Sequence, residues 1–373
     1  MAHPRIHLPG KQPRRPRRGW AARWRRGSGA VRIGARADMS GAERQATVRA
    51  TIVDVARAAG VSTATVSRFL NGSATLAPAT AERVRGAIAS LGYIPNIFAG
   101  SLASRSSKVV AVVVPGIVNS IIDKTVEQLV MRLSAAGVVP LLGITHLDPE
   151  RLHSITMAAL GMQAEAIIFT NQIPPDLRDL LARFDTTVIE IWGLPREPLD
   201  VAIGFSHREV GFALADYAAR QGYRRPHLVT AQSPRGQIRS DAFAERWAQN
   251  GGAVVTEQTV AIPLVYDHAG EVMAAIGSAA ERPDLIVVAS DLLAYELVRQ
   301  LQAGGLRVPQ DVAVIGFGDM AMPSAEPQLT TVRIDGTDIA DRVLDVLTLR
   351  GQGEDLPERR INCGFTIVPR GSA

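Results

Sequence analysis

The feature that most constrains the fold is an alternation of short apolar runs with amphipathic segments, which continues from about residue 108 to the C-terminus. The runs have the length of buried strands, and the segments between them have the hydrophobic period of helices. Continuous apolar strands separated by helices predict parallel sheets covered on both faces. The predicted strands lie at 109–114, 138–143, 166–170, 187–192, 226–230, 284–289 and 311–317.

Helical segments between and after these runs are expected near 120–136, 150–160, 207–221, 237–249, 267–279, 291–303 and 335–350. The span is long enough for two sheets. We therefore predict a two-lobed α/β core of parallel doubly wound sheets, with a ligand cleft at the carboxyl ends of the strands.

Three short amphipathic helices precede this core, so the fold class is an all-α domain followed by an α/β core. They are expected at 52–59, 63–70 and 78–91, with Gly60 and the pair Asn71-Gly72 as stops. A weaker helical stretch follows from Asn96 to Ser104.

Charge is distributed unevenly along the chain. Residues 1–50 carry 13 basic and 2 acidic side chains, whereas residues 108–373 carry 23 basic and 32 acidic ones. A basic N-terminal region followed by an acidic remainder is typical of a protein whose first part binds a polyanion. Basic groups favour such binding because they release the counterions condensed on nucleic acid. The distribution therefore points to DNA or RNA as a partner.

The first 48 residues are rich in Arg, Pro and Gly and show no apolar period, so we expect them to be unstructured. They lack the apolar stretch of a secretory signal and the serine content of a transit peptide. Two interpretations remain for the basic residues. They form an arm that strengthens nonspecific DNA binding, or residues 1–38 have no function, being either untranslated, with Met39 as the start, or an inert tail; we favour the second.

The segment TIVDVARAAGVSTATVSRFLNG, from Thr51, has the form of a helix-turn-helix. Ala56 and Ala59 are small enough for close helix contact, Gly60 permits a sharp turn, and Ser62 can cap the second helix. The first residues of such a second helix meet base edges in the major groove, where Thr and Ala suit thymine and Arg suits guanine. An ordinary helical hairpin is the alternative. The outward residues are Thr63, Ala64, Thr65, Ser67 and Arg68.

Three consecutive stretches resemble the lactose-repressor family of bacterial transcription regulators. The helix-turn-helix is followed by PATAERVRGAIASLGYIPN, which resembles the third helix of that family with its Y-x-P-N signature, and then by IFAGSLASRSS, which resembles its hinge helix. The resemblance implies that Thr63, Ala64 and Arg68 read operator bases. It also implies that Asn71 and Tyr93 lie near phosphates and that Leu102 wedges into the minor groove.

The hinge suggests how binding is switched. A helix from Asn96 to Ser104 is far shorter than helices that are stable alone, so we expect it to order only when paired with its symmetry mate on DNA.

The core resembles the periplasmic-binding-protein-like core of the same family, and details near 190–205, 207–225 and the C-terminus resemble its gluconate-repressor branch. An Arg in a cleft suits a carboxylate, and an Asp can accept hydrogen bonds from hydroxyls, so we expect a sugar acid as effector. Ser290 stands where many relatives carry Asn. The expected effector-binding residues are Gly116, Asn119, Glu190, Arg239, Ser290, Asp291, Phe317 and Asp319.

Two other function classes compete with a regulator. The string GFGDMA at 316–321 formally fits a dinucleotide-binding pattern, but Pro323 and Pro327 oppose the helix that must open there to hold a pyrophosphate. The core also suits a secreted sugar-binding protein, which the helix-turn-helix and the missing signal sequence oppose. We expect no enzyme activity, cofactor or metal site.

The sequence therefore predicts a cytoplasmic repressor that binds a palindromic operator as a homodimer, controlled by a gluconate-like sugar acid, with no membrane segment. The single cysteine, Cys363, fits a reducing compartment. Dimer and tetramer, the operator and the sign of regulation stay open. The predicted regions are a disordered basic extension at 1–48, a DNA-binding domain at 49–94, a hinge and linker at 95–107, and an effector-binding and dimerisation core at 108–373.

Overall fold

The computed structural model describes residues 50–70, 76–94, 107–116, 122–253, 255–279, 281–322 and 325–373. The expected basic extension, the hinge helix and the candidate residues Asn71, Leu102 and Asn119 lie outside these ranges. The chain divides into two compact units, one within residues 1–105 and one containing nearly all residues from 106 onward. No helix in the described ranges is both long and apolar enough to cross a membrane.

Three helices form the first unit: α2 (Ile52–Ala59), α3 (Thr63–Leu70) and α4 (Pro78–Leu91). The structure confirms the predicted bounds of all three. Helix α2 begins at a capping box, in which Thr51 and Asp54 each accept a backbone N–H of the other. The core of this unit is small and consists of the buried side chains of Val55, Ala56, Ala59, Val66, Val84 and Ala87.

The second unit begins with an α/β lobe. Its strands are β1 (Val109–Val114), β2 (Val139–Ile144), β3 (Ala166–Phe169), β4 (Thr187–Ile191), β5 (Val201–Gly204) and β11 (Arg360–Asn362). Its helices are α6 (Asp123–Ala135), α7 (Pro149–Gly161), α8 (Pro175–Leu181) and α13 (Gly336–Gln352). The strands lie in the order β11-β5-β4-β3-β1-β2, and every neighbouring pair is parallel. Helices α7 and α8 share a hydrophobic core with one face of this sheet.

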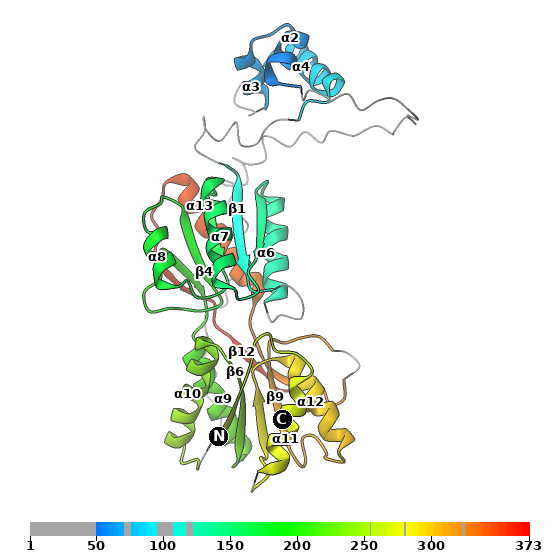
Figure 1. The fold of residues 1–373 in the computed structure, drawn as a ribbon, viewed down its shortest axis with the longest axis vertical. Helices are drawn as coiled ribbons and strands as arrows, with labels where there is room; N and C mark the ends of the chain where they lie inside the picture. Colours follow the sequence, from blue (N-terminus) through cyan, green and yellow to red (C-terminus); the bar gives the residue numbers. More distant parts are fainter. Residues whose placement is uncertain are drawn as a thin grey trace, which may run out of the picture. The chain divides into compact units, whose positions relative to one another are not determined.

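A second α/β lobe follows. Its strands are β6 (Pro226–Ala231), β7 (Thr256–Val260), β8 (Leu285–Val288), β9 (Ala313–Phe317), β10 (Thr330–Arg333) and β12 (Thr366–Val368). Its helices are α9 (His207–Gln221), α10 (Pro234–Gln249), α11 (His268–Ser278) and α12 (Asp291–Ala303). The strand order is β12-β10-β9-β8-β6-β7. Figure 1 shows α9 and α10 on one side of this sheet and α11 and α12 on the other.

The chain passes between the two lobes three times: from β5 to α9, from β10 to α13, and from β11 to β12. Each lobe is therefore built from separate stretches of sequence. Since the strands of both sheets are mainly parallel, the loops at their carboxyl ends are the expected position of a ligand cleft.

The structure departs from the prediction in three places. The pair β10 and β12 is antiparallel, because β12 reaches the edge of its sheet directly from the other lobe. Strands β5, β7, β10, β11 and β12 and helix α8 were not predicted; β7, for example, has the polar sequence TEQTV at an exposed sheet edge. Helix α10 begins at Pro234, three residues before the predicted start, because Ser233 caps it and Pro is well tolerated at the first helical position.

Candidate DNA-reading helix and effector cleft

The turn between α2 and α3 has the geometry that the sequence pattern predicts. Gly60 has a φ of 64°, in the left-handed region, and its backbone N–H turns back to the last carbonyls of α2. The N–H of Val61 donates to the carbonyl of Ala56 at 3.0 Å. Val61 packs against the small core of the unit, so the turn is held by hydrogen bonds and by an apolar plug.

The start of α3 presents polar side chains to solvent. Ser62 caps the helix, as predicted, by accepting the N–H of Thr65 at 3.2 Å, and its hydroxyl also lies 2.9 Å from the Thr65 hydroxyl. Thr63 and Ala64 are exposed beside this cap, and Arg68 is exposed one turn later. Thr65 and Ser67, also proposed to face DNA, are partly buried.

The inward side of α3 holds the unit together. Val66 is fully buried and Leu70 packs against the same core, as their spacing predicts. Tyr93, expected near a phosphate, is partly buried and packs against this core, so its ring is held by the three helices.

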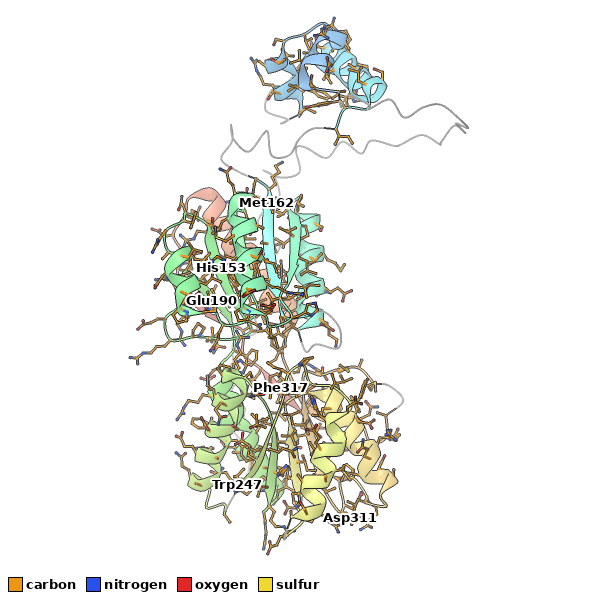
Figure 2. The ribbon with its side chains drawn as sticks, viewed as in Figure 1. His153, Met162, Glu190, Trp247, Asp311 and Phe317 are labelled. Carbon is orange, nitrogen blue, oxygen red and sulfur yellow. The ribbon has the colours of Figure 1, made fainter. Side chains whose placement is uncertain are left out.

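In the second unit, the structure brings together two of the predicted effector residues, Arg239 and Phe317. The Arg239 guanidinium lies over the Phe317 ring, with 4.5 Å between the guanidinium carbon and the ring centroid. Arg239 comes from α10 and Phe317 from the carboxyl end of β9. Figure 2 shows Phe317 at the end of the second lobe nearest the first, whereas Trp247 and Asp311 lie towards the opposite end.

A buried histidine completes this cluster, and the sequence interpretation had not assigned it. One Nη of Arg239 lies 3.0 Å from Nδ1 of His207, and Nε2 of His207 lies 3.0 Å from the carbonyl of Trp192. Burial and the positive charges of Arg239 and Arg235 lower the pKa of His207 to about 2. At neutral pH the ring is therefore neutral, with Nε2 donating to Trp192 and Nδ1 accepting from Arg239.

Aromatic rings extend the cluster into the first lobe. The ring of Phe205 contacts His207 edge to face, with 4.6 Å between centroids, and lies 5.7 Å from Trp192. Trp192 follows β4 with a φ of 65°, rare for a bulky residue, and its indole N–H donates to Thr125 of α6 at 2.9 Å. Backbone strain of this kind is concentrated at functional sites.

Arg235 joins the two lobes directly. It lies on α10, and its Nη1 and Nη2 donate to the carbonyls of Thr170 and Ile191 in the first lobe, at 2.6 and 3.0 Å. A second bond between the lobes runs from Nζ of Lys124 to the carbonyl of Asp319, at 3.1 Å. Arg235 was missed because the helix was expected to start later; its position four residues before Arg239 is the signal that could have revealed it.

Two of the predicted acidic residues lie at the carboxyl ends of β8 and β9 but already hold protein donors. The carboxylate of Asp291 accepts the hydroxyl of Thr331 and the N–H of Met320, both at 2.6 Å, and burial raises the pKa of Asp291. Ser290 is buried beside it, before the first turn of α12.

Asp319 is bound by two arginines, from β10 and from the C-terminal segment. It accepts Nε of Arg333 at 2.5 Å and also binds Arg370. Although burial opposes the change, hydrogen bonds from Arg370 and Arg333 lower the pKa of Asp319, so its carboxylate is ionised at neutral pH.

Glu190 and Gly116 are not brought to the cluster of Arg239 and Phe317 by any described contact. Glu190 is buried in β4, where it accepts two bonds from Arg178 of α8 at 3.2 Å and the N–H of Leu199 at 2.9 Å. Gly116 is half-buried just after β1.

Space within the second lobe is limited. The cavity beside Arg239 and Phe317 measures about 30 Å³, enough for one or two water molecules. This cavity is too small for a sugar, and the carboxyl ends of the two sheets stay the expected position of a ligand of that size.

The dinucleotide pattern at 316–321 does not lead into a helix. After β9 the next element in the described residues is the strand β10, so no helix N-terminus is available there for a pyrophosphate.

Comparison with known proteins agrees with this architecture. Residues 51–96 match the model of bacterial regulatory proteins of the lacI family, and residues 215–373 match that of a periplasmic binding protein-like domain. The transcriptional regulator GntR of Pseudomonas aeruginosa is 28% identical over 333 residues, which cover 87% of this chain and 96% of that protein. The transcriptional repressor PurR of Photobacterium profundum is 28% identical over 319 residues, covering 84% and 95%.

A solved structure gives the same result over most of the chain. The crystal structure of a LacI family transcriptional regulator from Silicibacter pomeroyi matches with a TM-score of 0.78 and 25% identity, covering 87% of this chain and 99% of that one. These relatives are regulators of transcription and not enzymes. The chain thus has a helix-turn-helix domain of the lacI family of bacterial regulatory proteins, followed by a two-lobed periplasmic-binding-protein-like core, and over most of its length it is similar to transcriptional regulators of that family.

Proposed function

We propose that this regulator is a cytoplasmic repressor, that it binds a palindromic operator as a homodimer, and that a small sugar acid sets its affinity for the operator. The observation that carries the effector half of this proposal is the Arg239 guanidinium, which stacks on Phe317 and faces a neutral histidine, without an ion pair among the described residues. A buried cation without a counterion favours an anionic ligand.

The DNA half of the proposal rests on the first turns of α3. Thr63, Ala64 and Arg68 are exposed on a helix whose opposite side is anchored by Val66. A methyl group or a small side chain suits the thymine methyl, and an Arg can bind guanine through two hydrogen bonds. We assign base reading to these three residues and to the flanking Thr65 and Ser67.

The rest of the DNA-binding proposal follows the family resemblance. Asn71 and Tyr93 contact phosphates, and Leu102 inserts into the minor groove. There the free-energy cost of unstacking a base step is offset by the additional contacts that the bent DNA makes with the protein. The segment 95–107 then links the DNA-binding domain, 49–94, to the effector-binding core, 108–373.

For the effector, Arg239 binds the carboxylate and the polar groups after β1, β8 and β9 bind the hydroxyls. Each oxygen of Asp291 and Asp319 has a second lone pair besides the one already used, so both carboxylates can still accept a hydroxyl. Ser290, Gly116 and Asn119 complete the proposed set of effector-binding residues. Glu190 supports the site indirectly, because it holds α8 in place. Gluconate, a six-carbon sugar acid with one carboxylate, is the compound of this class that we propose to test.

A homodimer is supported by exposed apolar side chains on α6 and on β2, the edge strand of the first lobe. Met131 is 59% exposed, Val139 43% and Leu142 37%. Exposed apolar side chains at an open sheet edge are typical of an interface between chains. We place the contact between two copies of the core here.

The test begins with selection of binding sites from a random duplex library by the purified protein. A palindromic consensus supports the proposal, and no enrichment contradicts it. Arg68→Ala should then weaken binding to that site by about 10- to 100-fold, the cost of one bidentate base contact, with little change on random duplex. Gluconate at millimolar concentration should raise the melting temperature of the protein, whereas glucose, which lacks the carboxylate, should not.

A further inference from the structure

Helix α10 places two guanidinium groups where the two lobes meet, and the proposed carboxylate of the effector accounts for only one of them. Arg235 and Arg239 are one turn apart on the same face of the helix, about 6 Å along its axis. Neither forms an ion pair with any residue that the structure describes. The cleft therefore has two positive charges to be compensated.

The acidic side chains nearby do not supply the missing charge. The negative charge of Glu190 acts on Arg235, but the Glu190 carboxylate is already bound by Arg178 and by the N–H of Leu199. Asp319 is bound by two other arginines, and His207 is neutral. Burial lowers the pKa of both Arg235 and Arg239 to about 10, so both stay charged at neutral pH.

Arg235 also has N–H groups that the described hydrogen bonds do not use. A guanidinium has five N–H groups, and the described hydrogen bonds use two of them, on the carbonyls of Thr170 and Ile191. Gly193 stands next to the group, and a Cβ atom at that position would lie only 3.2 Å from Nε of Arg235. A side chain at position 193 would therefore crowd the guanidinium, which glycine allows to lie close to this segment of the first lobe.

We propose, resting on the proposed function, that the effector is a sugar acid with two anionic groups, one bound by Arg239 and the other by Arg235. A compound with one carboxylate leaves one buried guanidinium without a counterion, which costs affinity. The second anionic group is either another carboxylate or a phosphate at the far end of the chain. Because Arg235 already bonds to the first lobe, this second group binds where the two lobes meet.

The test is calorimetric titration of the full-length protein with three compounds of the same carbon skeleton: gluconate with one carboxylate, glucarate with two, and 6-phosphogluconate with a carboxylate and a phosphate. We expect at least one of the two dianions to bind tenfold or more tightly than gluconate, and which one does so identifies the second group. If gluconate binds as tightly as both dianions, the inference fails while the proposed function stands. If none of the three binds, both fail.

A set of variants assigns the second charge to Arg235. Arg235→Gln should remove the preference for the dianion, so that the ratio of its affinity to that of gluconate falls from tenfold or more to about one. Arg246→Gln is the matched control, because Arg246 lies on the same helix but pairs with Asp216 away from the cleft, at 2.7 Å. Its affinities should be unchanged.

The opposite pattern would show that Arg235 only holds the lobes together. In that case Arg235→Gln would weaken gluconate and dianion equally, and the inference would be overturned. Arg235→Lys is a second variant, for the case that Arg235→Gln misfolds, because it keeps the positive charge. It should still prefer the dianion. Loss of that preference would also count against the inference.

Discussion

Helices α3 and α10 both carry polar side chains in their first two turns, but in different surroundings. At the start of α3, Thr63 and Ala64 are exposed, and the cap by Ser62 is the main local contact. At the start of α10, Arg235 and Arg239 are largely withdrawn from solvent and bonded to carbonyls and a histidine of other elements. An exposed helix start suits a large flat ligand such as duplex DNA, whereas a desolvated one suits a small anion.

The two units also differ in the size of the buried core that stabilises them. The three-helix unit has a core of six buried side chains, so one substitution there removes a large share of its stability. The core unit has two separate sheets with extensive buried clusters, so a single polar group in the cleft can change without loss of the fold. This contrast makes the two functions separable by mutation.

The largest effect is expected from Val66→Asp. A carboxylate without a partner in the small core should cost several kcal/mol and unfold the three-helix unit, which abolishes operator binding. Effector binding, measured by calorimetry, should stay within twofold of the unmodified protein. Val53→Asp is the matched control, because Val53 is 50% exposed on α2. Loss of effector binding in Val66→Asp would mean that the two functions are not separable.

The next effect is expected from Arg239→Gln, which should weaken effector binding by about 10- to 100-fold. A hydrogen bond to a charged group contributes about 1.5–3 kcal/mol, and the variant also removes the stacking on Phe317. Titration calorimetry measures the change. Operator affinity without effector should be unchanged, and an equal effect of Arg246→Gln would contradict the assignment.

A smaller effect concerns the pH dependence of stability. The pKa of His207 is about 2 in the folded protein, below its ordinary value of 6.5, so the unfolded chain binds a proton that the folded one does not. The free energy of unfolding of the core should therefore fall as the pH falls below 6.5, by up to about 1.4 kcal/mol per pH unit from this group. His207→Gln should reduce this slope in urea titrations between pH 5 and 6.5. Part of the slope should remain in the variant, because burial also lowers the pKa of His227. An unchanged slope would refute the role of His207.

The smallest effect is expected from Ser62→Ala, which removes the cap of α3. The three-helix unit should lose about 1 kcal/mol, seen as a lower melting temperature of that unit. Ser90→Ala, which removes only a bond to the carbonyl of Ala87 near the end of α4, should cost less. An equal cost for both substitutions would argue against a special role of the cap.

The sequence predicted the local features of this protein better than the dispersed ones. The helix-turn-helix was predictable because its turn, cap and core positions lie within one short stretch, and Ala56, Gly60 and Ser62 behave as expected. Strong apolar runs such as the one in β1 were also recognised. The edge strand β7 was not, because its polar residues carry no hydrophobic pattern.

The cleft was harder to predict because five or more elements contribute to it. Arg239 and Phe317 were found through the family resemblance, but His207 and Arg235 were missed. Their roles depend on tertiary contacts: His207 is significant because Arg239 and Trp192 surround it, and Arg235 because it reaches the other lobe. No local pattern contains that information.

The central claim is that the helix-turn-helix reads a two-fold-symmetric site and that the core sets its affinity. The most direct measurement is fluorescence anisotropy of a labelled palindrome, taken from the selected sites, titrated with the full-length protein with and without its sugar acid. The account predicts clear preference for the palindrome over random duplex and a shift of at least fivefold in operator affinity when the sugar acid is present. Equal binding to both duplexes, or the same operator affinity at saturating effector, would contradict it.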